Sequence, residues 1–498
     1  VFVHFVVKSV SARLRWVFAV ANLLVTSLPL GVLGAEDEVS QVLPPRPPWD
    51  ASRVIGSPDP PPPYTVEPVF TQIDWGNLVY LCREPGTPWL LVARWPTGDE
   101  PGQVVRIADQ ADADTTTPFL TLPDRAIYTV AFHPDYQTNG KIYVCSKNNA
   151  EEMNYLSRFS VPRWTADSPR APCDPASEEK ILQWKSTGHD GAAVAFGHDG
   201  MLYVSVGDGT GDSDDDLTAQ DPTNWQGSIL RIDVDRPAPG QAYSIPDDNP
   251  FVEIAGVRGE IWSLGHRNPW RMTVDEKTGH LWVGNNGQDL WEYAHLIRKG
   301  DNAGWSVYEG SHPFYLNRQR GPGTFAPPTV EHDHSEFRSL TGGVVYYGSQ
   351  LPDLEGAYIY GDYSTGAIWG VKHDGERVVW NRALANTQLA IVAFATSHRE
   401  ELLVVDHVSG IYRLTTPPTE PSHPTFPKRL SDTGLFEDTA RLLPHPGVVA
   451  YSVTAPAWND GAVAERLIGL PDDKQISNTA GAWEFPEGTV LAQTLSLE

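Results

Sequence analysis

The chain has 498 residues, among them 43 glycines, 43 prolines and 17 tryptophans, a composition typical of short strands joined by tight turns rather than of a helical bundle. Its formal net charge of −26 would repel a phosphate backbone, which excludes a nucleic-acid partner and favours a small molecule or a protein. The three cysteines, Cys82, Cys145 and Cys173, form no CxxC or CxxCH motif, which excludes a covalent c-type haem and a cysteine zinc site within this chain. A disulfide such as Cys82 with Cys145 stays open at this point.

Residues 1–35 are ordered like an export signal. Basic residues precede an apolar run over residues 16–33, and Gly34-Ala35 offers a small-residue cleavage site. The run is nearly long enough for a membrane anchor, but Pro29 and the acidic flank favour cleavage. We therefore expect a periplasmic or extracellular protein without a membrane segment after cleavage. A proline-rich linker is predicted over residues 36–63.

A repeated pattern fills residues 64–415: a turn with Asp or Gly, an apolar-aromatic strand, then Gly or Asp. Five clear copies and a weaker one over residues 75–95 predict an all-β, six-bladed β-propeller. Its inner strands converge on a central channel, and one mouth of that channel is the natural ligand site. A linker over residues 416–438 and a partial β-rich module over residues 439–498 are predicted to follow. The clear copies begin at Phe132, Phe196, Val274, Leu354 and Ser397.

Several motifs in the propeller region resemble one known family. They occur in the order HDGAAVAFGHDGMLYVSVGDGTGDSDDD, GSILRIDVD, IWSLGHRNPWRM, LWVGNNGQDLWEYAHL, KGDNAGWSVYEG, SLTGGVVYYG and GAYIYGDYSTGAIWGV. Together they are similar to the soluble glucose/sorbosone dehydrogenases that use pyrroloquinoline quinone (PQQ), over about residues 64–414. The resemblance implies a six-bladed propeller that holds the quinone in its channel with a calcium ion beside it. The region after residue 414 resembles an extension that often precedes a cytochrome c domain, which implies a cytochrome c as electron acceptor.

Two classes of function follow from this resemblance. The first is a PQQ-dependent dehydrogenase that oxidises a sugar or a related alcohol or aldehyde. The second is an exported binding propeller that has kept the fold and lost the redox centre, because relatives that interact with hedgehog proteins share the fold without evident redox work. A nicotinamide enzyme is not expected, since no Rossmann glycine fingerprint opens a helix in this chain.

Sugar oxidation requires a base, a hydride acceptor and a positive group where negative charge develops. No amino-acid side chain accepts hydride, so a cofactor must do so. His189, in the sequence TGHDGA, is predicted to be the base, because imidazole titrates near neutral pH and the family's catalytic histidine falls at this position. Asp190 either orients this imidazole, close to the cofactor, or is a turn residue beside Gly191.

Arg267 and Asn268, in the motif GHRNP, are predicted to lie against the quinone, with Arg267 stabilising the developing anion. The alternative for Arg267 is a structural arginine that bridges blades. The resemblance implies that backbone carbonyls of Gly287 and Gln288 bind calcium. It also places Glu292 at an acidic position near the cofactor, where the alternative is an exposed loop carboxylate.

Two other polar stretches admit a metal site or a simpler interpretation. Residues 208–216 carry five aspartates in the pattern DGTGDSDDD, which resembles a calcium loop but lacks the EF-hand's terminal glutamate; a solvated acidic turn is the alternative. Residues 331–336, EHDHSE, offer two histidines to a transition metal or form a polar rim of the channel.

The chain departs from the sugar-oxidising members at three places. The sequence LPDRA over residues 122–126 replaces an expected glutamine, and no arginine pair stands at residues 384–394. Thr365 occupies the turn where the family carries a cofactor-binding lysine, and is predicted to contact the cofactor in its place. Fewer cations would hold the carboxylates of PQQ less firmly.

Overall fold

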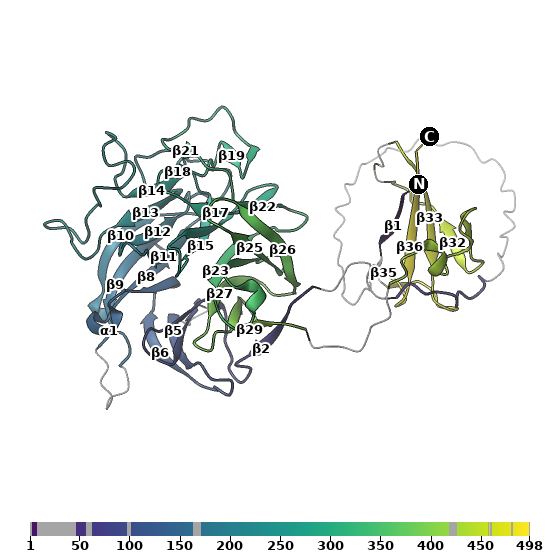
Figure 1. Cartoon of the computed structure of the whole chain (residues 1–498), viewed down its shortest axis with the longest axis horizontal. Coiled ribbons are helices and arrows are strands. Elements are labelled where there is room, and N and C mark those ends of the chain that lie inside the picture. The colour runs from purple at the N-terminus through teal and green to yellow at the C-terminus, as the bar shows by residue number, and fades with distance from the viewer. Residues whose placement is uncertain are drawn as a thin grey trace, which may run out of the picture. The chain divides into compact units, whose positions relative to one another are not determined.

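The computed structural model describes residues 2–6, 46–55, 62–96, 101–162, 171–417, 426–456, 458, 461–479 and 482–497. The chain forms two compact units, residues 62–417 and residues 1–61 with 418–498 (Figure 1). The predicted export signal, apart from strand β1 (Phe2–Val6), lies outside the described residues, as does part of each predicted linker. No helix among the described residues is long and apolar enough to cross a membrane.

The larger unit is built from antiparallel sheets whose strands follow one another along the chain, as tight turns between short strands dictate. From the inner strand outward, the six sheets found among the described residues are β3 (Leu78–Arg83), β4 (Trp89–Arg94), β5 (Gly102–Ala108) and β6 (Thr116–Leu122); β7 (Ala126–Phe132), β8 (Lys141–Asn148), β9 (Met153–Ser160) and β10 (Glu179–Lys185); β11 (Gly191–Phe196), β12 (Leu202–Val206), β13 (Ser228–Ile232) and β14 (Ile261–Leu264), extended by β18 (Asp301–Asn302) and β21 (Thr324–Phe325); β15 (Asn268–Val274), β16 (Leu281–Asn286), β17 (Trp291–Ile297) and β22 (Val330–Asp333); β23 (Leu340–Tyr346), β24 (Ala357–Asp362), β25 (Ala367–His373) and β26 (Val378–Asn386); and β27 (Ile391–Thr396), β28 (Leu402–Asp406), β29 (Gly410–Thr415) and β2 (Thr65–Val69).

The six sheets close into a ring (Figure 1). The inner strands contact one another in the order β3, β7, β11, β15, β23, β27 and back to β3. Strand β2, from the start of the unit, pairs with β29 from its end, with Val66 opposite Leu414. This pairing joins the two ends of the ring, so no sheet edge is left open at the closure. The predicted all-β, six-bladed propeller is confirmed.

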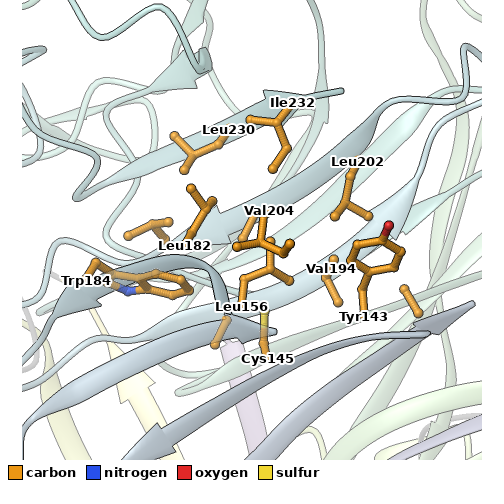
Figure 2. Close-up of a cluster of buried hydrophobic side chains, with 14 of the residues drawn as sticks. Tyr143, Cys145, Leu156, Leu182, Trp184, Val194, Leu202, Val204, Leu230 and Ile232 are labelled. Atoms are coloured by element: carbon orange, nitrogen blue, oxygen red, sulfur yellow. The ribbon is translucent and has the colours of Figure 1, made fainter. Parts of the chain in front are cut away.

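Apolar side chains from neighbouring blades form the core of the ring. Figure 2 shows Tyr143 and Leu156 of one blade packed toward Val194, Val204 and Leu230 of the next. These side chains alternate along their strands with residues that face the other side, as a sheet buried between two others requires. Each fully buried aliphatic or aromatic side chain of this kind stabilises the fold by about 1.5–3 kcal/mol.

All three cysteines are free thiols, so the disulfide that the sequence left open between Cys82 and Cys145 does not form. Cys82 lies on β3 and Cys145 on β8, in different blades. Burial raises the pKa of the Cys145 thiol to about 12, which keeps it protonated and unreactive near neutral pH.

The smaller unit is also rich in β-structure. Its main sheet has the strand order β1–β36–β33–β32, with two small hairpins beside it. Trp49 is fully buried in its core, and its indole nitrogen donates to the Gly434 carbonyl at 2.9 Å. The strands are β30 (Phe436–Asp438), β31 (Leu443–Pro444), β32 (Val448–Tyr451), β33 (Val463–Gly469), β34 (Ser477–Thr479), β35 (Ala482–Glu484) and β36 (Val490–Ser496). The remaining short elements of the chain are α1 (Tyr136–Asn139), the 3-10 helices η1 (Pro175–Ser177), η2 (Pro352–Leu354) and η3 (Leu430–Asp432), and the hairpin β19 (Tyr308–Glu309) with β20 (His312–Pro313).

Every inner strand of the propeller carries a β-bulge near its start. The register shifts by one residue on each of the six strands, so one residue of the inner strand has no partner opposite it. A bulge bends its strand and re-aims the extra residue, and such bulges occur next to ligand sites. On five of the strands the extra residues are Val79, Tyr128, Trp270, Thr341 and Val392; on β11 the shift falls within Gly191–Val194.

Candidate active site

A cavity of about 220 Å³ lies where inner strands from four blades meet. The bulged residues Val79, Trp270, Thr341 and Val392 contribute to its wall. Aromatic rings give the wall flat apolar faces, and the amides and hydroxyls of the wall can hydrogen-bond. Among the described residues that line it, none is Lys, Arg, Asp or Glu. The other side chains of the wall include Trp95, Asn268, Asn286, Ser339, Tyr363 and His407.

His189 lies beside this cavity, on the segment that leads into β11. Its backbone is fixed by a bond from His189 N to the Thr210 carbonyl at 2.8 Å. Its Nδ1 lies 2.8 Å from Oδ1 of Asp208, whose side chain is fully buried. A carboxylate only accepts, so Nδ1 carries the proton and Nε2 is left with a free lone pair. Within the described part of the chain Nε2 has no protein partner, and the side chain is 15% exposed.

Asp208 is itself held from the opposite side. Its Oδ2 accepts a hydrogen bond from the indole nitrogen of Trp305 at 2.8 Å, and its Oδ1 also accepts from Thr210 N at 3.0 Å. These donors stabilise the charged carboxylate and fix its direction. Sequence reasoning grouped Asp208 with an acidic turn and missed its contact with His189. The available signal was its place directly after a buried strand, in the sequence VGDG.

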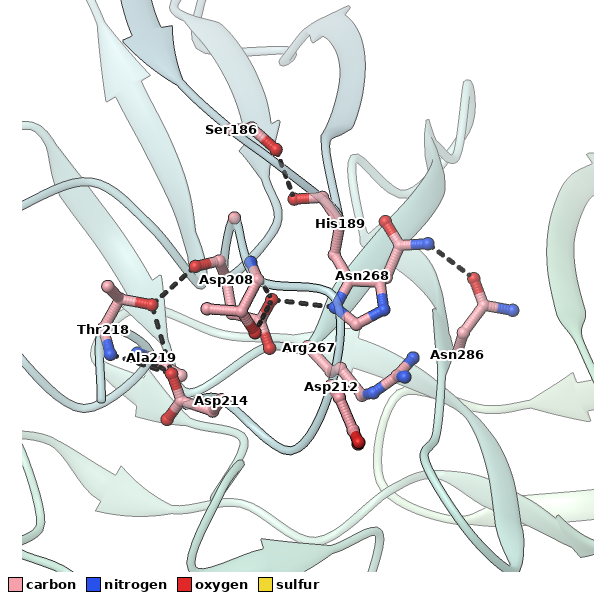
Figure 3. Close-up of polar contacts among 12 residues, drawn as sticks. Ser186, His189, Asp208, Asp212, Asp214, Thr218, Ala219, Arg267, Asn268 and Asn286 are labelled. Carbon is pink, nitrogen blue, oxygen red and sulfur yellow. Dashed lines mark hydrogen bonds and ion pairs between the residues drawn. The ribbon is translucent and has the colours of Figure 1, made fainter. Parts of the chain in front are cut away.

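Arg267 and Asn268 lie next to this pair (Figure 3). Asn268 accepts from the Gly191 backbone at 3.1 Å and donates to Oδ1 of Asn286 at 2.9 Å. The Arg267 guanidinium lies over the Trp305 ring, 5.6 Å from its centroid, and donates twice to Oε1 of Gln288, at 2.9 and 2.6 Å. The structure therefore brings together His189, Arg267 and Asn268, which are up to 79 positions apart in the chain.

The turn that contains Gly287 and Gln288 is built on a buried carboxylate. Glu309 Oε1 accepts backbone hydrogen bonds from Gln288 at 2.6 Å, from Asp289 at 2.6 Å and from Leu290 at 3.0 Å. A Cβ on Gly287 would lie 1.5 Å from the Trp291 carbonyl, so only glycine fits there. The sequence gave no signal for Glu309. Among the described residues no group of three or more His, Cys, Asp and Glu side chains could hold a metal ion.

Asp190 does not orient the imidazole; Asp208 does so. The Asp190 carboxylate instead accepts from Lys147 Nζ at 2.9 and 3.0 Å, from Asn154 at 2.9 Å and from Tyr128 at 2.8 Å. Its side chain is turned away from His189 because consecutive residues at a strand start face opposite sides. It is an internal ion pair between blades, with no polar atom left for a cofactor.

Glu292 is not an exposed loop carboxylate, the alternative that the sequence left open. It lies on β17, is 1% exposed, and accepts from Leu340 N at 2.7 Å and from His334 Nε2 at 3.3 Å. The bond to Glu292 raises the pKa of His334. Thr365 lies in the turn after β24, where its N–H donates to Asp362 at 2.7 Å. Tyr363, two residues earlier, reaches the cavity wall instead.

The two stretches considered as metal sites have structural roles. In the first, Asp214 is buried and accepts from Thr218 N at 2.8 Å and from Ser306 Oγ at 2.6 Å; burial raises its pKa. It is therefore neither a calcium ligand set nor a solvated turn. In the second, His332 is buried between Glu336 at 2.9 Å and the Tyr360 hydroxyl at 2.8 Å, and burial lowers its pKa.

A six-bladed ring with an axial cavity and an imidazole–carboxylate pair beside it defines the class: a propeller with a ligand site on its axis. Residues 126–391 match the family model described as Glucose / Sorbosone dehydrogenase. The match spans more than half of the chain, and the chain belongs to the glucose/sorbosone dehydrogenase family.

Three known proteins illustrate the similarity. HIPL1 protein of Arabidopsis thaliana is 29% identical over 360 residues, which cover 59% of this chain and 50% of the relative. Aldose sugar dehydrogenase YliI of Escherichia coli K12 is 35% identical over 205 residues, which cover 40% of this chain and 52% of the relative. The PQQ-bound form of aldose sugar dehydrogenase from Streptomyces coelicolor has a TM-score of 0.54 at 22% identity, over 72% of this chain and 100% of that one, and it supports the fold. The chain spans about half the length of the two curated relatives.

Proposed function

We propose that this protein is a quinone-dependent oxidoreductase that oxidises a sugar or a related alcohol or aldehyde, with His189 as the base. The observation that carries the proposal is the hydrogen bond of 2.8 Å between His189 Nδ1 and the buried Asp208 carboxylate, which leaves Nε2 free beside an axial cavity. Membership of a family of glucose and sorbosone dehydrogenases supports it.

The residues of the cavity fit a planar quinone such as PQQ over most of its surface. The rings of Trp95, Trp270 and Tyr363 offer apolar faces to a flat ring system, and the Asn268 and Asn286 amides can bond its oxygens. Three carboxylates are fitted less well, because the described wall has no lysine or arginine. Arg267, at the mouth, is the residue proposed to meet the negative charge. Asp190 and Thr365 take no part in this proposal.

His189 would take the proton of the substrate hydroxyl on Nε2. Asp208 would then stabilise the imidazolium, as it already holds Nδ1 and is itself fixed by Trp305. The quinone, when bound, supplies the acceptor for the hydride and its two electrons. Arg267 would stabilise negative charge on the acceptor's oxygens through its fork of donors. General-base assistance of this kind is worth about 10²–10⁴ in rate.

A calcium ion remains part of the proposal through the backbone. The side-chain amide of Gln288 is occupied by Arg267 and by Asp212, so the carbonyl oxygens of Gly287 and Gln288 are the groups proposed to bind the ion. A hard cation accepts carbonyl ligands, and Glu309 already fixes the turn that carries them.

Reconstitution tests the proposal. The purified protein is titrated with PQQ in the presence of calcium, bound quinone is followed by its absorbance, and dye reduction is measured with a panel of sugars, alcohols and aldehydes. We expect saturable binding and turnover on at least one substrate. Calcium is then removed with a chelator, which should release the quinone if the carbonyl site holds the ion. Binding without turnover on the whole panel would contradict the assigned role of His189.

A binding propeller without redox activity is the second candidate. One observation favours it: the described residues that line the cavity include no cation to pair with the three carboxylates of PQQ. In that case the same titration would give no bound quinone and no dye reduction, while the folded protein would still bind another ligand or a protein partner.

A further inference from the structure

Arg271 lies on the axis of the ring, at the floor of the cavity. It belongs to β15 and is 4% exposed. Its guanidinium donates to three backbone carbonyls from three other blades: Val79 O at 2.5 Å, Tyr128 O at 3.2 Å and Val392 O at 3.0 Å. All three acceptors are the bulged residues of their strands, whose carbonyls the regular ladder does not use. Arg271 thus satisfies the groups that the bulges leave unpaired.

The charge of Arg271 has no counter-ion. In the described part of the chain, no carboxylate lies within ion-pair distance of its guanidinium. Carbonyl dipoles stabilise the cation but leave its full formal charge in place. Burial lowers the pKa of Arg271 to about 10, so it stays charged at neutral pH. The two tyrosines that face it, Tyr80 and Tyr128, are neutral at that pH because burial raises the pKa of each.

This charge lies directly beneath the cavity. Two of the three residues whose carbonyls it binds, Val79 and Val392, line the cavity, and the Trp270 ring between guanidinium and cavity wall has its centroid 4.7 Å from the Arg271 Cζ. In a low-dielectric interior a fixed charge acts on a neighbouring ligand far more strongly than it does in water. The described wall has no charge of its own to oppose it.

We propose that Arg271 makes the axial cavity selective for planar aromatic anions over neutral molecules of the same shape. The flat rings of the wall accept the aromatic part, the amides at the mouth face the polar part, and the buried guanidinium supplies the attraction for negative charge. The proposal shares the cavity with the proposed function but none of its redox chemistry, so it stands or falls separately.

The test uses a matched pair of probes, 2-naphthoate and 2-naphthamide, which have nearly the same shape and differ in charge. Their dissociation constants are measured by calorimetry on the full chain without added quinone. We expect naphthoate to bind about tenfold or more tightly than naphthamide. Ser339→Trp, which fills the cavity from its wall, should abolish binding of both probes and so assign the site. Equal affinities, or tighter binding of the amide, would overturn the proposal.

Two variants identify the charge. Arg271→Met should bring the two affinities together, whereas Arg267→Met should leave most of the preference in place. Retention of the preference in folded Arg271→Met, or its loss in Arg267→Met alone, would refute the role of Arg271. Circular dichroism checks that each variant is folded, and Arg271→Lys, which keeps the charge, should keep the preference.

A measurement on the unchanged protein decides the matter if Arg271→Met does not fold. A guanidinium stays protonated between about pH 6 and pH 9, so the preference for naphthoate should be constant over that range. An imidazolium of His189 or His407 would instead lose its charge as the pH rises through about 6.5, and the preference would disappear. A preference that falls with rising pH would therefore contradict the proposal.

Discussion

The mouth and the floor of the axial cavity each carry an arginine, and the surroundings of the two differ. Arg267, at the mouth, bonds the side chain of Gln288 and lies over Trp305, next to His189 and Asp208. Arg271, at the floor, bonds only backbone carbonyls of three other blades. The two are four residues apart, on either side of the bulge at Trp270. Residues of the mouth keep free polar atoms for a ligand, whereas those of the floor use theirs to hold the ring together.

The largest effect is expected at the floor. Arg271→Met leaves three buried carbonyls without a donor, and each unsatisfied group costs about 1–3 kcal/mol, so the free energy of unfolding should fall by about 3 kcal/mol or more. Arg267→Met, the matched control at the mouth, should lower it by less than about 1 kcal/mol. Chemical denaturation of both variants measures this difference. Similar losses in the two variants would remove the distinction between floor and mouth.

At the mouth, His189→Gln should lower turnover by about 100-fold or more, because the amide cannot take the substrate proton. Its thermal stability should change little. The control is His198→Gln, an exposed histidine in the same blade. Steady-state rates with saturating quinone measure the effect, and full turnover of His189→Gln would exclude this residue as the base.

A smaller effect is expected from the carboxylate behind the imidazole. Asp208→Asn keeps the shape of the side chain but no longer stabilises an imidazolium, so turnover should fall about tenfold or more and its pH dependence should move to lower pH. Asp190→Asn removes the partner of Lys147 instead. This second variant should lower stability and leave the pH profile where it was, since Asp190 does not contact His189. A pH profile that moves in Asp190→Asn would contradict that assignment.

The smallest predicted effect concerns two buried histidines in the wall. Burial lowers the pKa of His266 and lowers that of His295 to about 3. In the unfolded chain both would titrate near 6.5, so below that pH the unfolded state binds protons that the folded state refuses. Stability should therefore fall as the pH drops below 6.5, by about 2 kcal/mol per histidine at pH 5.

This pH dependence can be assigned by substitution. His295→Asn should flatten the dependence of unfolding free energy on pH between about pH 5 and pH 7. His198→Gln, on the surface, should leave it unchanged. If His295→Asn keeps the full slope, another group is responsible for the acid sensitivity.

The sequence alone determined the fold class and where its repeats lie. Strands of alternating polarity, separated by Gly- and Asp-containing turns, report local backbone preferences, and those preferences survive in the folded ring. The positions of His189, Arg267 and Asn268 were also visible, because each stands in a short motif at a strand start. The module after the propeller was predicted only as β-rich, and its strands are short.

The tertiary structure decided which groups meet. His189 pairs with Asp208 rather than with its neighbour Asp190, because adjacent residues at a strand start face opposite sides and a turn 19 residues away supplies the carboxylate. The buried role of Glu309 and the three carbonyls around Arg271 depend on bulges in strands far apart in the chain. A bulge shifts the register by one residue and reverses which side a residue faces. The polarity pattern of a single strand does not contain that information, which arises only when six strands share one axis.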